Sequence, residues 1–332
     1  MTKKMMDLSV SYMGLKLGSP IVMSSSRLTS SADNIRIYAR QGAGAVVLKS
    51  IFEEQIIADI EEKLGDHPMY FWYPRAADHI KDISKEHGLN EYLALIREAK
   101  KETRIPIIAS VNCITAKEWP GFSKKIQDAG ADGLELNISI VPFDETVESI
   151  TIEDAYIEII REVKKFVTIP IAVKIGTGFT NIARMVRRID NEGVNAVVMF
   201  NRFFRPDLNI DDETVVTDNY LSSPVEITVP LRWIGALSNK VKCDLAASTG
   251  IHDYTGVAKV ILAGAAVAQI CSTVYKNGPE VIGTMLNDLK SWMTKHHYDT
   301  PAQFRGKILK GREKTGSFER IQFMRKTTGL NL

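Results

Sequence analysis

Short apolar runs alternate with segments of helical periodicity from residue 20 to about residue 297. Most of the eight runs are apolar throughout and rich in β-branched residues, which is typical of parallel strands buried on both faces. Between them, apolar residues recur at helical spacing, as in Ile182, Met185, Val186 and Ile189. The pattern predicts a parallel sheet whose strands are connected by helices. The predicted strands are residues 20–25, 45–50, 106–111, 133–139, 170–175, 196–201, 244–248 and 267–273.

A two-strand pattern repeats four times along these elements. A glycine precedes each even-numbered strand, where it ends the preceding helix without Cβ strain, and proline opens three of the odd-numbered strands. Odd and even strands of a closed eight-stranded barrel fill alternate interior layers. The repeat therefore predicts an α/β fold, a (β/α)8 TIM barrel, rather than an open sheet. The glycines are Gly42, Gly130, Gly193 and Gly264.

Composition agrees with one large globular domain and reveals an uneven charge distribution. The 332 residues are 45% hydrophobic and 25% charged, with a net charge of +2. Residues 301–332 carry eight basic and two acidic residues, which leaves 34 basic and 38 acidic residues before them. We expect a barrel domain over residues 1–310 and a basic C-terminal extension over residues 311–332. The extension is either solvated or docked on an acidic neighbour or subunit.

Several classes of function are disfavoured by composition. A near-neutral chain lacks the dense positive surface that binds nucleic acid. Cys113, Cys243 and Cys271 lie too far apart for a disulfide framework or an iron–sulfur ligand run, and none of the six histidines ends a predicted strand. No apolar stretch approaches the roughly 20 residues that span a bilayer. We therefore expect a cytoplasmic protein without a metal site, a membrane segment or a nucleic-acid partner.

Polar residues close every predicted strand. Active sites of TIM barrels form at the C-terminal ends of the strands. Burying such groups without partners costs free energy, so a purely structural barrel has no reason to gather them there. The strand-end candidates are Ser24, Ser25, Lys49, Ser50, Asn112, Asn137, Ser139, Lys174, Asn201, Arg202, Ser248, Thr249, Gly250, Cys271 and Ser272.

Two lysines and two glycine-containing junctions narrow the chemistry. Lys49 and Lys174 each follow three apolar strand residues, so we expect half-buried ammonium groups. Each lysine either pairs with a loop carboxylate or holds positive charge against an anionic cofactor or a developing negative charge. The junctions AASTGIHDYTG and QICSTVYKNGPE at the last two strands combine small residues, hydroxyls and glycine, which lets backbone amides approach a phosphate.

Seven motifs, in chain order, resemble the soluble dihydroorotate dehydrogenases, which are FMN-binding (β/α)8 barrels. The resemblance covers most of residues 7–310. It implies an FMN-dependent oxidoreductase of pyrimidine biosynthesis that moves a hydride between flavin N5 and a small cyclic substrate, dihydroorotate or a related compound. It also implies a homodimer. The motifs are SPIVMSS, VVLKS, GLELNIS, IAVKIG, VVMFN, ASTGI and QICSTVYKNGPEVI.

The resemblance also implies roles for individual residues. Lys174 would face the pyrimidine edge of the flavin, where negative charge appears on reduction. Lys49 would lie near both flavin and substrate, and Asn137 and Asn201 would contact the substrate. The residues along the flavin ring and ribityl chain would be Ser24, Ser25, Lys49, Ser50, Asn112, Asn137, Lys174 and Asn201. The FMN phosphate would be held by Thr249, Gly250, Cys271 and Ser272.

The substrate half of the site departs from the family pattern. After the asparagine of the fourth strand the family has NxSCPN or NxSSPN, in which Cys or Ser is the catalytic base. Here Ile140 occupies that position, and an isoleucine cannot accept a proton, so Ser139 is the nearest candidate base. The family's NSMGLPN substrate loop is absent. The aromatic-rich residues 67–78 occupy that stretch, either as a lid or as cover for the barrel rim.

Two arginines follow the sixth strand, where the family usually has a serine. Arg202 and Arg205 either bind an anionic substrate or pair with Asp207 and Asp211. Because base and substrate loop differ, an alternative function is an FMN-binding protein without dihydroorotate turnover. A third alternative is a phosphosugar barrel enzyme without flavin.

Overall fold

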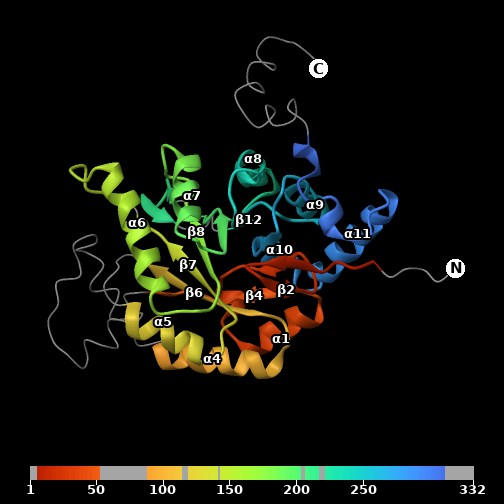
Figure 1. Ribbon diagram of the computed structural model, residues 1–332, viewed down its shortest axis with the longest axis horizontal. Helices are drawn as coiled ribbons and strands as arrows, with labels where there is room; N and C mark the ends of the chain where they lie inside the picture. The colour runs from red at the N-terminus through yellow and green to blue at the C-terminus, as the bar shows by residue number, and fades with distance from the viewer. Residues whose placement is uncertain are drawn as a thin grey trace, which may run out of the picture.

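A computed structural model describes residues 6–52, 88–113, 119–140, 143–202, 206–216 and 221–310. Its main sheet is a closed barrel of parallel strands, because β4 pairs with β3 on one side and with β6 on the other (Figure 1). The predicted TIM barrel is confirmed. The barrel strands are β3 (Ile21–Met23), β4 (Ala45–Val47), β6 (Ile107–Cys113), β7 (Gly133–Ile138), β8 (Ile171–Ile175), β9 (Ala196–Met199), β12 (Asp244–Ser248) and β13 (Val267–Ile270). A short strand β5 (Ile51–Phe52) also pairs with β6.

Helices surround the barrel and bury the stripes expected from the sequence. The stripe Ile182, Met185, Val186 and Ile189 of α7 is buried. The four glycines that precede even-numbered strands all have positive φ, between 69° and 113°, which confirms their predicted role in ending helices. The helices are α1 (Ala32–Arg40), α4 (Leu89–Glu102), α5 (Trp119–Asp128), α6 (Ser149–Lys164), α7 (Ile182–Asn191), α8 (Thr228–Leu237), α9 (Tyr254–Leu262), α10 (Ser272–Asn277) and α11 (Val281–Lys295). Short 3-10 turns are η1 (Arg27–Thr29), η2 (Pro224–Ile227), η3 (Pro301–Gln303) and η4 (Lys307–Leu309).

An N-terminal hairpin closes one end of the barrel. It consists of the antiparallel strands β1 (Val10–Tyr12) and β2 (Leu15–Leu17). Tyr12 and Met13 are fully buried among small apolar side chains of the barrel interior. Met13 N donates to the carboxylate of Asp244, which begins β12, so the plugged end is the N-terminal end of the strands. The hairpin does not cover the other end of the barrel, where the C-terminal ends of the strands carry polar groups.

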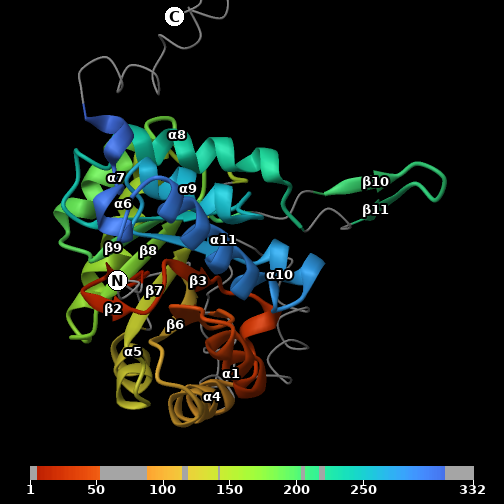
Figure 2. The ribbon, with the colours of Figure 1, turned by 90° about the vertical axis from the view of Figure 1, so that its right-hand side faces the viewer.

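A second hairpin projects from the body of the protein (Figure 2). Its strands are β10 (Asp207–Asn209) and β11 (Thr214–Val216), which pair antiparallel. The hairpin was not predicted, because each strand has only three residues and four acidic residues lie within it.

The remaining predictions concern the ends and connections of the chain. Arg305 binds Asp244 and the carbonyl of Gly264, so the chain is attached to the barrel almost to residue 310. The predicted extension 311–332, the aromatic segment 67–78 and Arg205 lie outside the described residues. Among the helices that the structure describes, none has the length and apolar character needed to cross a membrane.

Candidate active site

A cavity of about 150 Å³ opens at the C-terminal ends of the barrel strands. Among the described residues, its lining offers hydroxyl, amide and cationic groups and no carboxylate. Ten predicted residues are brought together here from strands β3, β8, β9, β12 and β13 and the residues that follow them. They are Ser24, Ser25, Lys174, Asn201, Arg202, Ser248, Thr249, Gly250, Cys271 and Ser272.

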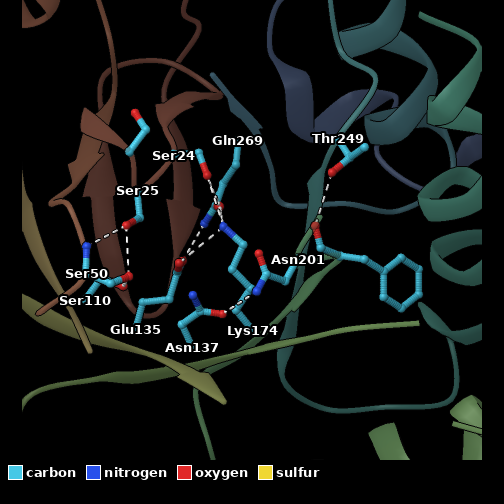
Figure 3. A network of polar contacts seen from close by, with 12 residues as sticks. Ser24, Ser25, Ser50, Ser110, Glu135, Asn137, Lys174, Asn201, Thr249 and Gln269 are labelled. Carbon is cyan, nitrogen blue, oxygen red and sulfur yellow. Dashed lines mark hydrogen bonds and ion pairs between the residues drawn. The ribbon is translucent and has the colours of Figure 1, made fainter. Parts of the chain in front are cut away.

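Lys174 is the charged centre of this cavity (Figure 3). Its side chain is buried, and Nζ donates to Ser24 Oγ at 3.0 Å and to Gln269 Oε1 at 3.3 Å. Nζ also lies 3.5 Å from Glu135 Oε1. We call Ser24, Glu135, Lys174 and Gln269 the Lys174 cluster. The lysine is thus more deeply buried than the sequence predicted, and its carboxylate comes from a barrel strand rather than from a loop.

Glu135 and Gln269 were missed by sequence reasoning, which searched only strand ends. Glu135 lies two residues before Asn137 on β7, so both side chains belong to the same face of that strand. The same argument connects Gln269 with Cys271. A search for polar residues at alternate strand positions below the barrel mouth would have found both.

A second cluster of hydroxyls links three strand ends beside the Lys174 cluster. Ser50 Oγ lies 3.0 Å from Ser25 Oγ and 2.8 Å from Ser110 Oγ. The Tyr92 hydroxyl accepts from Ser110 N at 2.7 Å and donates to Ser110 O at 2.9 Å, which ties α4 to β6. Burial raises the pKa of Tyr92, so its phenol stays neutral. The predicted residues Ser25 and Ser50 are therefore in direct contact, although Ser50 does not line the cavity.

The two asparagines predicted to contact substrate lie side by side. Asn201 Nδ2 donates to Asn137 Oδ1 at 3.0 Å. Asn112 pairs with Asn137, and Asn137 with Lys174, across the neighbouring strands β6, β7 and β8. The row places amide groups next to the ammonium at one level of the barrel, where they can orient a flat polar ligand.

The loops after β12 and β13 form a narrow corner of the cavity. Thr249 and Gly250 have φ of 83° and 77°, and Thr249 Oγ1 donates to Phe200 O at 3.2 Å. A Cβ on Gly250 would lie 2.1 Å from Ile227 N, so only glycine fits there. Burial raises the pKa of the Cys271 thiol, which therefore stays protonated at neutral pH.

Ser222 joins this corner and was also missed. Its hydroxyl lies 3.1 Å from His252 Nε2 and 3.4 Å from Gly250 N, and its backbone N donates to Ser272 Oγ at 2.9 Å. Burial and the nearby Lys276 charge lower the pKa of His252, so the imidazole is mainly neutral at pH 7. The residue lies in a connection between strands, where no strand-end rule applies.

Arg202 forms a nearly buried ion pair at the edge of the cavity. Its Nε donates to Glu226 Oε2 at 3.0 Å, while Glu226 Oε1 accepts from Ser223 N at 2.8 Å. Sequence reasoning offered Asp207 and Asp211 as ion-pair partners and did not find Glu226, because this glutamate lies in η2, some 24 residues further along the chain. The pair fixes Arg202 beside the cavity.

Five predicted site residues do not line this cavity: Lys49, Ser50, Asn112, Asn137 and Ser139. Ile140 is buried, Ser139 is half-buried, and neither is among the described residues that border the cavity. Lys49 lines a larger space of about 400 Å³ between α1 and α4. This space adjoins β5, and the residues that directly follow β5 lie outside the described ones. We assign no ligand to that space.

The polar groups that line the cavity fit part of the flavin mononucleotide that the resemblance implies. The described lining residues offer hydroxyls, backbone amides and one buried ammonium and no carboxylate, and such a set suits a phosphate and an anionic ring edge. The volume is below the roughly 300 Å³ of a typical whole-ligand site, so the cavity accounts for part of such a group. The described residues contain no cluster of His, Cys, Asp and Glu suited to a metal ion.

Comparison with known proteins identifies a family and relatives for this chain. The family model described as dihydroorotate dehydrogenase matches residues 7–293. The catalytic subunit of dihydroorotate dehydrogenase B (NAD(+)) from Thermoplasma volcanium is 26% identical over 315 residues, covering 92% of this chain and 100% of that protein. The protein of the same description from Thermoplasma acidophilum is 27% identical over 296 residues, covering 87% and 94%. That from Methanothermobacter thermautotrophicus is 24% identical over 296 residues, covering 86% and 93%.

Proposed function

The chain belongs to the dihydroorotate dehydrogenase family, and from this premise we propose that it is an FMN-dependent oxidoreductase acting on CH–CH groups. It would transfer a hydride between a small cyclic substrate, dihydroorotate or a related compound, and flavin N5. The observation that carries the proposal is the buried ammonium of Lys174, in a cavity whose described lining residues include no carboxylate.

The cofactor half of the site would be held mainly by hydroxyls and backbone amides. Bound FMN would supply the group that accepts and returns the hydride. Lys174 would hold its positive charge at the pyrimidine edge and stabilise the negative charge that reduction creates. The ring and ribityl chain would contact Ser24, Ser25, Lys49, Ser50, Asn112, Asn137, Lys174 and Asn201. The phosphate would be bound by Thr249, Gly250, Cys271 and Ser272.

The substrate half is supported by amide and cationic groups. The hydrogen bond between Asn201 and Asn137 fixes both amides, which would orient the ring of a cyclic amide or unsaturated acid. Arg202, held by Glu226, would bind a substrate carboxylate, and Lys49 would add a second positive charge. Both groups favour an anionic substrate.

Proton removal is where this chain differs from its family pattern. The buried side chain of Ile140 offers no proton acceptor, and Ser139 is the nearest hydroxyl in the chain. Ile140 therefore favours the second candidate function, an FMN-binding protein that does not turn over dihydroorotate.

Anaerobic titration of the purified protein with dihydroorotate tests the function. Bound FMN absorbs at about 450 nm and bleaches when it accepts a hydride. Bleaching within seconds would identify dihydroorotate as a substrate and show that Ile140 does not disable the chemistry. Unbleached but photoreducible flavin would support the second candidate and direct the search to related compounds. Colourless protein would favour the phosphosugar alternative.

We also propose that the protein is cytoplasmic and works as an assembly. The resemblance implies a homodimer, whereas the relatives reported above are described as catalytic subunits, which implies a partner of another kind. The β10–β11 hairpin supports a protein interface, because Leu208, Ile210 and Val215 are 67%, 85% and 68% exposed. The electron acceptor would then be a soluble compound or a partner subunit.

A further inference from the structure

Glu135 is a buried carboxylate in contact with the ammonium of Lys174. Its side chain is 1% exposed and does not line the cavity. Oε2 accepts from Gln269 Nε2 at 2.7 Å. Oε1 lies 3.5 Å from Lys174 Nζ and has no hydrogen-bond partner among the described residues. The carboxylate therefore acts on the cavity only through its neighbours.

Gln269 connects the two charges by the orientation of its amide. Its Nε2 donates to Glu135, and its Oε1 accepts from Lys174 at 3.3 Å and from Ser24 at 3.3 Å. An inverted amide would point its NH2 group at the ammonium and its oxygen at the carboxylate. Both contacts would then be unfavourable, so the two charges determine the orientation of the Gln269 amide. The amide in turn holds the carboxylate and the ammonium at a set distance.

The charge of Glu135 is not stable alone in its surroundings. The barrel interior beneath the pair is apolar, with Val22, Ala172, Val198 and Ala246 all fully buried. Without the ammonium of Lys174, the carboxylate would be an uncompensated charge in this interior, which is strongly unfavourable. Burial and the Glu135 charge also raise the pKa of Tyr12, so that phenol supplies no neutralising proton. Lys174 is thus the cation that balances Glu135.

We propose that Glu135 is a positioning residue for Lys174. It holds the ammonium at the cavity and offsets part of its charge, and it thereby lowers the reduction potential of flavin bound there. The inference rests on the proposed binding of FMN. The physical reason is that a carboxylate beside Lys174 opposes the negative charge that the flavin gains on reduction, in a medium of low dielectric constant.

The test is the midpoint potential of the FMN-loaded protein, measured anaerobically with reference dyes for wild type and Glu135→Gln. Glutamine has the same shape and can still accept from Gln269, but it carries no charge. We expect reduced FMN to gain at least about tenfold in affinity relative to oxidised FMN, a positive shift of about 30 mV for a two-electron couple. A purely structural role would change Tm without raising the potential.

A matched control removes a carboxylate from the other end of the barrel. Asp244→Asn alters the group that accepts from Met13 N and pairs with Arg305. We expect its potential to equal that of wild type. An equal shift in this control would overturn the assignment to Glu135.

Further outcomes separate this inference from the proposed function. A Glu135→Gln protein that binds FMN with an unchanged or lower potential overturns the inference and leaves the function intact. If this variant retains no flavin, Glu135→Asp takes its place. Its carboxylate is withdrawn by one methylene, so a smaller positive shift supports the inference and no shift overturns it. Wild-type protein that binds no FMN refutes the function and the inference together.

Discussion

Charge in the candidate site is concentrated in one residue, Lys174. Its three nearest polar neighbours come from three other strands, so the ammonium is held by the closed barrel and not by a flexible loop. An ammonium fixed before the ligand arrives needs no reorganisation when negative charge develops. This preorganisation supports the proposal that the site binds a flavin.

Replacing Lys174 is therefore expected to weaken flavin binding. Lys174→Met removes the charge and leaves Glu135 without its cation, so we expect FMN affinity to fall by at least about tenfold, from the loss of a charged hydrogen bond worth about 1.5–3 kcal/mol. Fluorescence titration of FMN measures it. The control Lys165→Met removes an exposed ion pair with Glu162 and should leave the affinity unchanged. Equal affinity in both variants would refute the role of Lys174.

Gly250 combines a positive φ with very restricted backbone space. Its φ of 77° and the 2.1 Å approach of a Cβ to Ile227 N make any side chain costly. We expect Gly250→Ala to lower the free energy of unfolding by at least about 2 kcal/mol, because conformational strain and displacement of η2 add together. Urea denaturation measures the difference. The control Gly18→Ala meets no atom within 4 Å and should cost less than about 1 kcal/mol. A cost below that of the control would contradict the predicted strain.

At the scale of elements, the sequence predicted strands and strand ends but not the contacts between distant segments. The fourfold pattern of glycine and proline predicted the barrel. A glycine that ends a helix and a proline that opens a strand act on residues adjacent in the chain, so both can be identified from the sequence. Glu135 was missed because its carboxylate is stable in a buried strand only beside the ammonium of Lys174. Lys174 is distant in the sequence and comes close to Glu135 only in the folded barrel. Ser222 and Glu226 lie in a connection whose path depends on the loop after β12.

The N-cap of α9 gives an element-scale prediction with a pH dependence. Burial would raise the pKa of Asp253, but hydrogen bonds from Thr255 and Gly256 outweigh it and lower the pKa. The stabilisation is therefore present above the unfolded-state pKa of about 3.9 and is lost as the pH falls through the folded-state value. We expect Asp253→Ala to cost about 1 kcal/mol at pH 7 and less near pH 3.

Urea denaturation at the two pH values tests this cap. The control Asp288→Ala removes an exposed carboxylate within α11, where we expect a change below about 0.5 kcal/mol at either pH. A cost for Asp253→Ala that stays constant or grows as the pH falls would contradict the assignment.

On the scale of the whole molecule, the barrel separates its two ends. One end is closed by Tyr12 and Met13, and the other gathers the polar residues of the site. The β10–β11 hairpin extends away from this body with apolar side chains in solvent, which is unfavourable for an isolated chain. This arrangement supports the proposals of catalysis in the barrel and association through the hairpin.

The hairpin predicts the effect of a charge on assembly. Ile210→Asp places a carboxylate at the most exposed apolar position of the hairpin, so we expect the mass measured by light scattering to fall from that of a dimer to that of a monomer. Phe143→Asp changes another apolar residue, 81% exposed before α6, and should leave the mass unchanged. A wild-type monomer that associates only with a different chain would instead favour a heteromeric assembly.

The most direct test of the account is the FMN stoichiometry of the purified wild-type protein, determined by equilibrium dialysis against FMN with absorbance detection. We expect one FMN to bind per chain in the wild-type protein, and we expect Lys174→Met to bind FMN with lower affinity. Failure of the folded wild-type protein to bind FMN, or equal binding by both proteins, would contradict the account.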